Sequence, residues 1–205
     1  MKPTKKPRKK RAYRLDDRAR AQARTRRRIV EAAVHLHERL GPAATTVSAI
    51  AARAGVQRLT VYRHFPDDAA MFAACTAHWG SLNPTPDAAL WASIPDPLAR
   101  AVAAVAAHCD YYSGTRGMWR VAYRDAPRVK PIRPVLGGFD AHLTNLAETL
   151  AAGFGAKGQT ARRLLATIRH ALAFATWSDL EDRGLADPEK ATLVRAWLEG
   201  VRAVR

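Results

Sequence analysis

The sequence predicts an all-α protein, and three observations carry that prediction. Alanine, leucine, arginine and glutamate dominate the segments that have helical periodicity. The alternation of β-branched and aromatic residues that a half-buried strand would show is almost absent. Capping residues, glycines and prolines divide the chain into about nine helices. We expect an N-terminal three-helix domain with a helix-turn-helix, followed by a C-terminal helical bundle.

We expect four helices in the N-terminal part, and each has a start or a stop signal. Three of them form the N-terminal domain, and the fourth links it to the second domain. Gly41-Pro42 ends the first, Thr45 or Thr46 caps the second, and Gly55 ends the second. Pro66, at a first helical position, opens the fourth. The expected ranges are about 24–40, about 46–54, about 57–64 and about 66–79.

A loop rich in proline separates these helices from the rest of the chain. Pro84, Pro86 and Pro95 lie between Gly80 and Pro97, with one short turn expected around 88–91. Asp96-Pro97 and Asp187-Pro188 are caps followed by a first-turn proline. The expected helices of this part span about 97–112, about 115–123, about 134–152, about 159–181 and about 187–204. We therefore place the second domain at residues 80–205.

Positive charge is concentrated at the N-terminus. Residues 1–28 hold fourteen lysines and arginines against Asp16 and Asp17, which accounts for most of the net charge of +16. Such a block repels itself and cannot bury a core, so residues 1–23 are expected to be a disordered arm that gains order on a polyanion. Nucleic acid is the favoured partner. A solubility tail or an anchor on an anionic membrane surface is the alternative.

Several classes of protein do not fit this sequence. No stretch approaches the roughly 20 apolar residues of a membrane span, and no secretory signal opens the chain, so we expect a cytoplasmic protein. Cys75 and Cys109 are expected to be buried and reduced. The Gly153–Gly158 string has the G-x-G-x-x-G spacing, but it follows a helix and not a strand. We predict no enzymatic activity, no cofactor and no metal.

The segment from Thr46 to Phe65 has the spacing of a helix-turn-helix. Ile50 and Val61 can lock two helices at a steep angle, and small alanines let those helices approach. Gly55 can adopt the positive φ of a tight turn. The second helix then exposes polar groups that suit a major groove, with arginines for guanine edges and threonine for a thymine methyl or a phosphate. These groups are Gln57, Arg58, Thr60, Arg63 and His64.

This segment resembles the DNA-binding domain of TetR-type repressors over residues 24–79. The resemblance is carried by Gly41, Thr45-Thr46, Ile50-Ala51, Ala54-Gly55-Val56, Thr60 and Tyr62-Arg63-His64-Phe65. Three residues depart from the pattern: Gln57 replaces a capping Ser or Thr, Leu59 replaces Gly or Pro, and Asp68 replaces a lysine that approaches a phosphate. The carboxylate of Asp68 argues against that backbone contact. The DNA-binding candidates are Arg28, Thr45, Thr46, Gln57, Arg58, Leu59, Thr60, Tyr62, Arg63 and His64.

The resemblance also implies a ligand pocket beyond about residue 97 and a homodimer formed by the last two helices. Large apolar side chains with a few polar ones suit an aromatic or lipophilic effector. The ligand-binding candidates are His108, Tyr112, Met118, Trp119, Tyr123, Phe139, His142, Phe174 and Trp177. Apolar stripes on the last two helices give the dimer candidates Leu164, Ile168, Leu172, Leu193, Trp197 and Val201.

These patterns predict a sequence-specific, DNA-binding transcriptional regulator. It is expected to be a repressor that a small-molecule effector releases from a double-stranded operator, with the basic arm reaching along the duplex or into its minor groove. An architectural protein that coats DNA without an operator is the alternative, followed by an enzyme acting on nucleic acid. An architectural protein would bind random duplex nearly as tightly as any one site.

Overall fold

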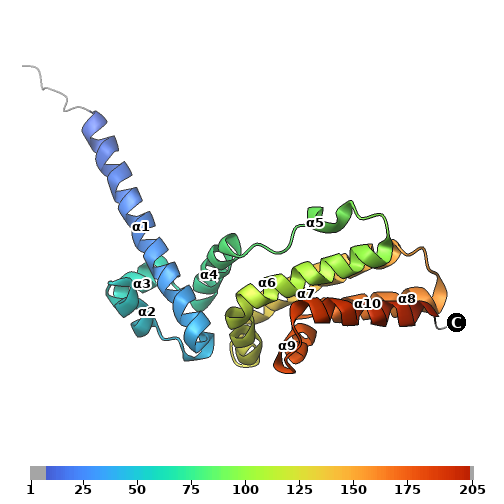
Figure 1. Cartoon of the computed structure of the whole chain (residues 1–205). Helices are drawn as coiled ribbons and strands as arrows, with labels where there is room; N and C mark the ends of the chain where they lie inside the picture. Colours follow the sequence, from blue (N-terminus) through green and yellow to red (C-terminus); the bar gives the residue numbers. More distant parts are fainter. Residues whose placement is uncertain (1–7, 204–205) are drawn as a thin grey trace, which may run out of the picture. The chain divides into compact units, whose positions relative to one another are not determined.

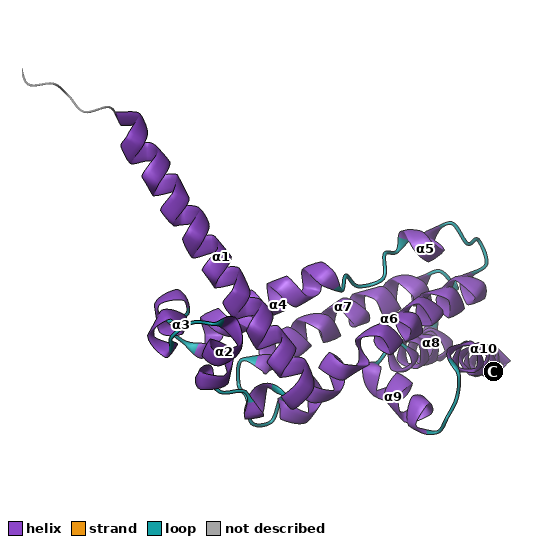
Figure 2. Cartoon of the chain, turned by 60° about the vertical axis from the view of Figure 1, so that its left-hand side comes forward, coloured by secondary structure: helices purple, strands orange, loops and turns teal. Residues whose placement is uncertain are grey.

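A computed structural model of the chain describes residues 8–203, and every regular element in that range is a helix (Figure 2). The all-α prediction is confirmed. The chain divides between Trp79 and Gly80 into two compact units, here called unit 1 and unit 2. Unit 1 contains α1 (Arg8–Leu40), a 3-10 turn (Pro42–Ala44), α2 (Val47–Ala54), α3 (Arg58–His64) and α4 (Asp68–Leu82), whose last turn runs on into unit 2. Unit 2 contains α5 (Ala89–Ala92), α6 (Pro97–Asp125), α7 (Ile132–Ala152), α8 (Gly158–Ala171), α9 (Phe174–Asp182) and α10 (Asp187–Ala203).

Helix α1 begins well before the expected start at Arg24. In place of the disordered arm expected over residues 1–23, the structure has helix from Arg8 onward, and residues 1–7 lie outside the described residues. Figure 1 shows this part of α1 projecting beyond α2 and α3. Residues 16–24 are exposed, so no apolar core holds them. Arginine, alanine and glutamine are good helix formers, and continuity with the packed half of α1 removes the cost of nucleation.

The core of unit 1 joins α1 to the helix-turn-helix. Ile29 and Ala33 of α1 are fully buried and belong to one cluster with Ile50 and Ala54 of α2 and Val61 of α3. Met71 and Cys75 of α4 complete that cluster. Helix α4 begins at Asp68 and not at Pro66, because the carboxylate of Asp67 accepts a hydrogen bond from the Ala70 amide at 2.7 Å.

Unit 2 is a bundle of four long helices with two short ones against it. Helix α10 packs on α6 and α8, and α7 packs on α6 and α8 (Figure 1). Helix α5 and helix α9 both pack against α6. Helix α6 runs without the break expected near Gly114, because Tyr112 and Thr115 on either side are buried and hold the backbone helical.

The single helix expected over 159–181 is two helices, α8 and α9. The break falls at Ala173, whose backbone is extended, and it leaves carbonyl groups without helical partners. The Thr176 hydroxyl donates to the carbonyl of His170 at 2.6 Å, and the Tyr112 hydroxyl donates to the carbonyl of Leu172 at 2.8 Å. These side chains replace the lost backbone bonds, which explains how the break is stable.

Membrane spans, metal ligands, the Gly153–Gly158 string and the two cysteines were the other subjects of sequence-based expectations. Within residues 8–203, no helix is long and apolar enough to cross a bilayer. The same residues hold no group of three or more histidine, cysteine or acidic side chains arranged for a metal. The Gly153–Gly158 string forms the turn from α7 to α8, so it follows a helix as expected. Both cysteines are buried, and burial raises the pKa of each thiol to about 12.

Candidate DNA-binding interface and effector site

The turn between α2 and α3 has the backbone that a helix-turn-helix requires. The Thr46 hydroxyl accepts from the Ala49 amide at 3.1 Å and caps α2. Gly55 ends α2 in the left-handed region, with φ 63° and ψ 42°. A Cβ atom at Gly55 would have nothing within 4 Å, so the glycine is needed for its backbone conformation and not for space.

Helix α3 has one buried face and one open face. Val61 and Phe65 point into the core of unit 1 and are nearly inaccessible. On the opposite face Leu59 is 66% exposed and Tyr62 is 45% exposed. Most of the apolar surface of Leu59 is therefore open to a partner. Arg58 and Arg63 lie on the same helix and are also exposed.

The polar residues of the predicted interface differ in how far they are already engaged. Arg63 donates from Nη2 to the Thr60 hydroxyl at 3.3 Å, which holds its guanidinium near the helix surface. Gln57 precedes α3 and makes no capping bond, so its amide faces solvent. His64 is half-buried beside Phe65, with ring centroids 6.5 Å apart.

Helix α1 brings further basic groups to this unit. The guanidinium of Arg26 lies 4.8 Å from the centre of the Phe65 ring and so ties α1 to the end of α3. Thr45 is half-buried, and its hydroxyl donates to the carbonyl of Gly41 at 2.9 Å. The sequence-based prediction did not include Arg26, because a cation–π contact across 39 positions has no local signal.

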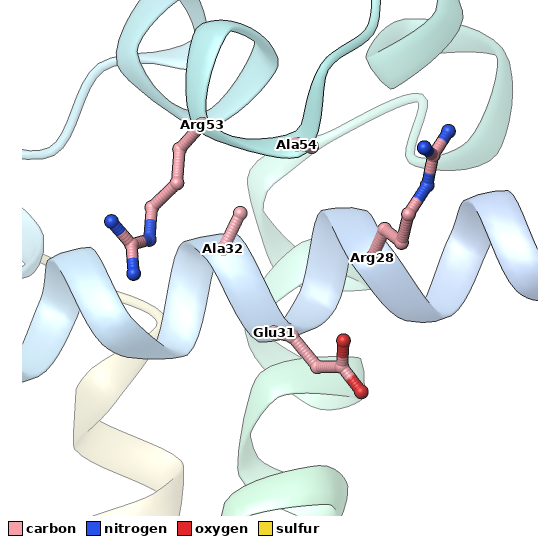
Figure 3. Close-up of a pocket in the computed structure, with 5 residues that line it drawn as sticks. All are labelled: Arg28, Glu31, Ala32, Arg53 and Ala54. Atoms are coloured by element: carbon pink, nitrogen blue, oxygen red, sulfur yellow. The ribbon is translucent and has the colours of Figure 1, made fainter.

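A surface hollow of about 370 Å³ lies between α1 and α2 (Figure 3). Arg28, Glu31 and Ala32 of α1 line it together with Arg53 and Ala54 of α2. Figure 3 shows the Arg28 and Arg53 side chains leaving on opposite sides of Ala32, while Glu31 points away. The two guanidinium groups therefore do not converge on one point, and the hollow is not a preformed site for a single anion.

Most of the predicted effector residues form one aromatic cluster around Tyr112 of α6. The Tyr112 ring contacts Trp119, Phe139, Phe174 and Trp177, with centroid distances of 5.4–6.3 Å. The members of the predicted set that the structure brings into this network of ring contacts are His108, Tyr112, Trp119, Tyr123, Phe139, His142, Phe174 and Trp177. Met118 is half-buried on the same helix and makes no described ring contact. Prediction from sequence missed Trp91 and Tyr111, which also belong to the network.

The cluster has a buried interior and an open edge. Tyr112 and Trp177 are each 1% exposed, whereas Tyr123 is 41% exposed and stacks on Phe174 at 5.4 Å. His142 is also exposed, and its ring lies 6.2 Å from that of Phe139. Burial raises the pKa of the Tyr112 and Tyr123 hydroxyls, so both stay protonated at neutral pH.

A buried ion cluster joins the end of α9 to the start of α10. Lys190 is 1% exposed, and its Nζ atom lies 2.5 Å from Glu181 Oε2 and 2.6 Å from Asp187 Oδ1. The same Asp187 oxygen accepts from Trp177 Nε1 at 3.1 Å. Burial works against the charge of Lys190, but the hydrogen bonds that its ammonium group donates to the two carboxylates outweigh this effect and raise the pKa of the lysine.

The predicted dimer residues need a correction. Leu164, Ile168 and Leu172 are fully buried inside unit 2, so they are core residues and do not reach a second copy. Leu193, Trp197 and Val201 are half-buried on α10. The open face of α8 is formed by residues that lie about one position away from the predicted stripe, so it points in a different direction around the helix axis. It forms, with α10, a groove of about 620 Å³ lined by Arg163, Ala166, Thr167, His170, Trp197, Gly200 and Val201.

The helix-turn-helix, its exposed basic helix α3 and the separate helical bundle define the class of DNA-binding transcriptional regulators. Comparison with known proteins relates part of unit 1 to a known family. Residues 29–75 match the sequence profile described as "Bacterial regulatory proteins, tetR family". The matched range contains α2 and α3, so unit 1 carries a DNA-binding domain of the TetR type. A search of curated proteins finds no significant match.

Solved structures share the fold over most of both chains. A TetR-like transcriptional regulator from Rhodococcus sp. is 20% identical, with a TM-score of 0.62 over 88% of this chain and 97% of its own. A second Rhodococcus regulator is 16% identical, with a TM-score of 0.57 over 86% and 95%. The multidrug binding protein EbrR, solved with imidazole, is 20% identical, with a TM-score of 0.52 over 84% and 88%. Identities this low establish the fold alone.

Proposed function

We propose that this regulator binds a specific operator with α3 in the major groove and leaves it when unit 2 binds a small molecule. The exposed face of α3 is the observation that carries the proposal. Four side chains, Arg58, Leu59, Tyr62 and Arg63, leave that face without covering any core. Exposed arginines beside an exposed leucine and tyrosine on one short helix provide both the charged donors and the apolar surface that contacts with DNA use.

Each side chain of that face suits a different feature of the duplex. The arginines have paired donors for the two acceptors of a guanine edge, and Leu59 offers apolar surface to a thymine methyl group. Tyr62 can donate its hydroxyl to a phosphate. Thr45, Thr46, Gln57, Thr60 and His64 are also proposed to contact the DNA backbone or bases.

The basic half of α1 is proposed to follow the phosphate backbone. Residues 16–28 are almost all exposed and carry six arginines, among them Arg28. These groups would add an affinity that falls steeply with salt and does not depend on sequence. Asp68 at the start of α4 would repel a phosphate, so we assign no backbone contact to that position.

Genomic selection on the purified protein tests the proposal. The regulator should enrich a discrete set of duplexes and bind the best of them at least about a thousandfold more tightly than random duplex at the same salt concentration. Competitive gel-shift titration gives that ratio. A ratio below about ten would contradict a regulator with an operator and would support an architectural protein that coats DNA.

A homodimer is proposed to form through the groove between α8 and α10, here called the α8–α10 groove. Trp197, Val201 and Ala166 give it an apolar lining, and Arg163 and His170 lie at the same face. A second copy related by a two-fold axis would place the same groove against itself and present two α3 helices to a pseudo-palindromic operator.

Replacing Trp197 by glutamate should convert the dimer to a monomer and weaken operator binding. The substitution removes the largest apolar side chain of the groove and buries a carboxylate there, and the cost of desolvating that carboxylate can exceed the gain from pairing it with Arg163. Sedimentation equilibrium gives the mass, and Leu82→Glu is the matched control because Leu82 is 66% exposed and lies outside this groove. A Trp197→Glu variant that sediments like the wild type would remove the α8–α10 groove from the dimer.

Effector binding is proposed to shift α4 and so change the distance between the two recognition helices. Helix α4 is suited to this role because it contributes Met71 and Cys75 to the core of unit 1 and runs on past Trp79. Two states that differ in effector affinity are enough to produce release. A protein of the same fold is described as a multidrug binding protein and was solved with imidazole, which supports small-molecule binding by this fold, and we propose unit 2 as the place of binding in this chain. We place the protein in the cytoplasm, with its DNA.

A further inference from the structure

The imidazole of His108 leaves one polar atom buried without a partner inside unit 2. Its Nδ1 atom lies 2.8 Å from the carbonyl oxygen of Ala104, one turn earlier on α6. A carbonyl oxygen only accepts, so Nδ1 carries the hydrogen and Nε2 of the neutral ring carries the lone pair. Nε2 is buried and meets no hydrogen-bond partner. The whole residue is 1% exposed.

The neutral ring is the form that the surroundings favour. Burial lowers the pKa of His108 below its ordinary value of 6.5, against the effect of the Ala104 hydrogen bond, and His142 lowers it further. At neutral pH Nε2 is therefore an acceptor. A buried acceptor without a donor has lost its hydrogen bonds to water and has no replacement for them. A ligand that donates a hydrogen bond to it would therefore bind with a more favourable free energy.

The rings around His108 do not supply that donor. The Trp91 ring centre lies 6.0 Å from that of His108, and the Tyr112 ring centre lies 6.3 Å from it. The single hydroxyl hydrogen of Tyr112 is already donated to the carbonyl of Leu172 at 2.8 Å. His108 thus combines an apolar, aromatic environment with one unmet acceptor, which is a recognition pattern for a flat molecule with a donor.

Trp91 holds its place against α6 by side-chain packing. It is the one buried residue of the four-residue helix α5, and its neighbour Leu90 is 65% exposed. The described hydrogen bonds of residues 84–92 stay within that segment or join it to Ile94 next to it. Arg100 anchors only the far end, through the carbonyls of Ile94 and Pro95. The indole can therefore leave α6 without breaking a hydrogen bond to the bundle.

We propose that the effector is a neutral, flat aromatic molecule with an N–H or O–H group, which replaces the Trp91 indole and donates to Nε2 of His108. The inference rests on the proposed function for the existence of an effector, and it adds the chemical class and the place of binding. A permanently charged molecule would lose its hydration among these rings without gaining a counter-charge at Nε2. The displaced α5 segment is then the part of unit 2 that reports binding.

Indole and 1-methylindole are the probes for the test, because they differ only at the donor. Isothermal titration without DNA measures both. The Trp91→Ala variant should bind indole at least about tenfold more tightly than the wild type, since the space is already open, and should prefer indole over 1-methylindole at least about tenfold. In Trp91→Ala combined with His108→Leu, that preference should fall below about twofold, whereas His108→Gln, which keeps an acceptor, should retain part of it.

The outcomes that overturn the inference are specific. A preference for indole that persists in the His108→Leu variant would show that His108 does not accept the ligand's hydrogen bond. Equal indole affinity with and without Trp91 would show that the ligand does not replace the Trp91 indole, and Trp91→Leu serves for this comparison if the alanine variant does not fold. Absence of binding to the wild type and both Trp91 variants up to about 5 mM removes the ligand class. Operator selection by the wild type is scored separately, so a regulator without this effector and an indole binder without an operator give different results.

Discussion

Replacing Lys190 by alanine should destabilise unit 2 by about 3–5 kcal/mol. The substitution leaves Glu181 and Asp187 close together without the cation that both contact. It also removes the side chain that lies 5.1 Å from the Trp177 ring. The carboxylates are only partly exposed, so water compensates for part of the loss and not for all of it.

Urea titration at pH 7 measures the loss, and tryptophan fluorescence reports it because Trp91, Trp119, Trp177 and Trp197 all lie in unit 2. The raised pKa of Lys190 means that this stabilisation is complete below its ordinary value of 10.5 and disappears only as pH rises through the folded value. Arg183→Ala is the control, because it removes one cation from an exposed i, i+4 pair with Asp179. That control should leave the urea midpoint almost unchanged because solvent screens the exposed pair, and equal losses in the two variants would refute the role of the buried ion cluster.

Arg58→Ala combined with Arg63→Ala should lower operator affinity by about 10²–10⁴-fold. Each arginine that pairs with a guanine edge contributes about 1–3 kcal/mol of discrimination, and the two lie on the same exposed face of α3. Affinity for random duplex should fall far less, because the basic half of α1 supplies most of the sequence-independent attraction. The expected result is therefore a loss of specificity more than a loss of binding.

Competitive gel-shift titration on the selected operator and on random duplex separates these two effects. Arg128→Ala is the matched control, since it removes one exposed positive charge from unit 2. A double variant that loses the same factor on both duplexes would mean that these arginines contact phosphates only. A double variant with unchanged operator affinity would place base recognition elsewhere and contradict the proposed function.

The helix-turn-helix could be predicted from sequence because its signals are local. The Thr46 cap, the left-handed Gly55 and the buried Val61 act within a few residues of their own positions, and the structure has each as expected. The predicted contacts of α3 with DNA remain predictions. The missing break in α6 and the extra break before α9 both depend on Tyr112, whose burial and hydroxyl bond join positions 60 residues apart.

Local sequence patterns also could not predict which face of α8 is buried. An apolar stripe on α8 could pack into the core of its own unit or against a second copy of the chain. In this structure Leu164, Ile168 and Leu172 fill the core of their own unit. The groove next to α10 is made by the residues one position away, such as Arg163 and Thr167. Only the packing of α10 on α8 decides between the two.

The order in which the helices of each unit contact one another has a consequence for synthesis of the chain. In unit 1, α1 packs on α2 and α2 packs on α3, so most partners are close in sequence and can assemble soon after they leave the ribosome. In unit 2, α6 packs on α10, which is made last. The face of α6 that α10 covers therefore stays open in the nascent protein until α10 has left the ribosome, and that interval is when aggregation threatens this molecule most.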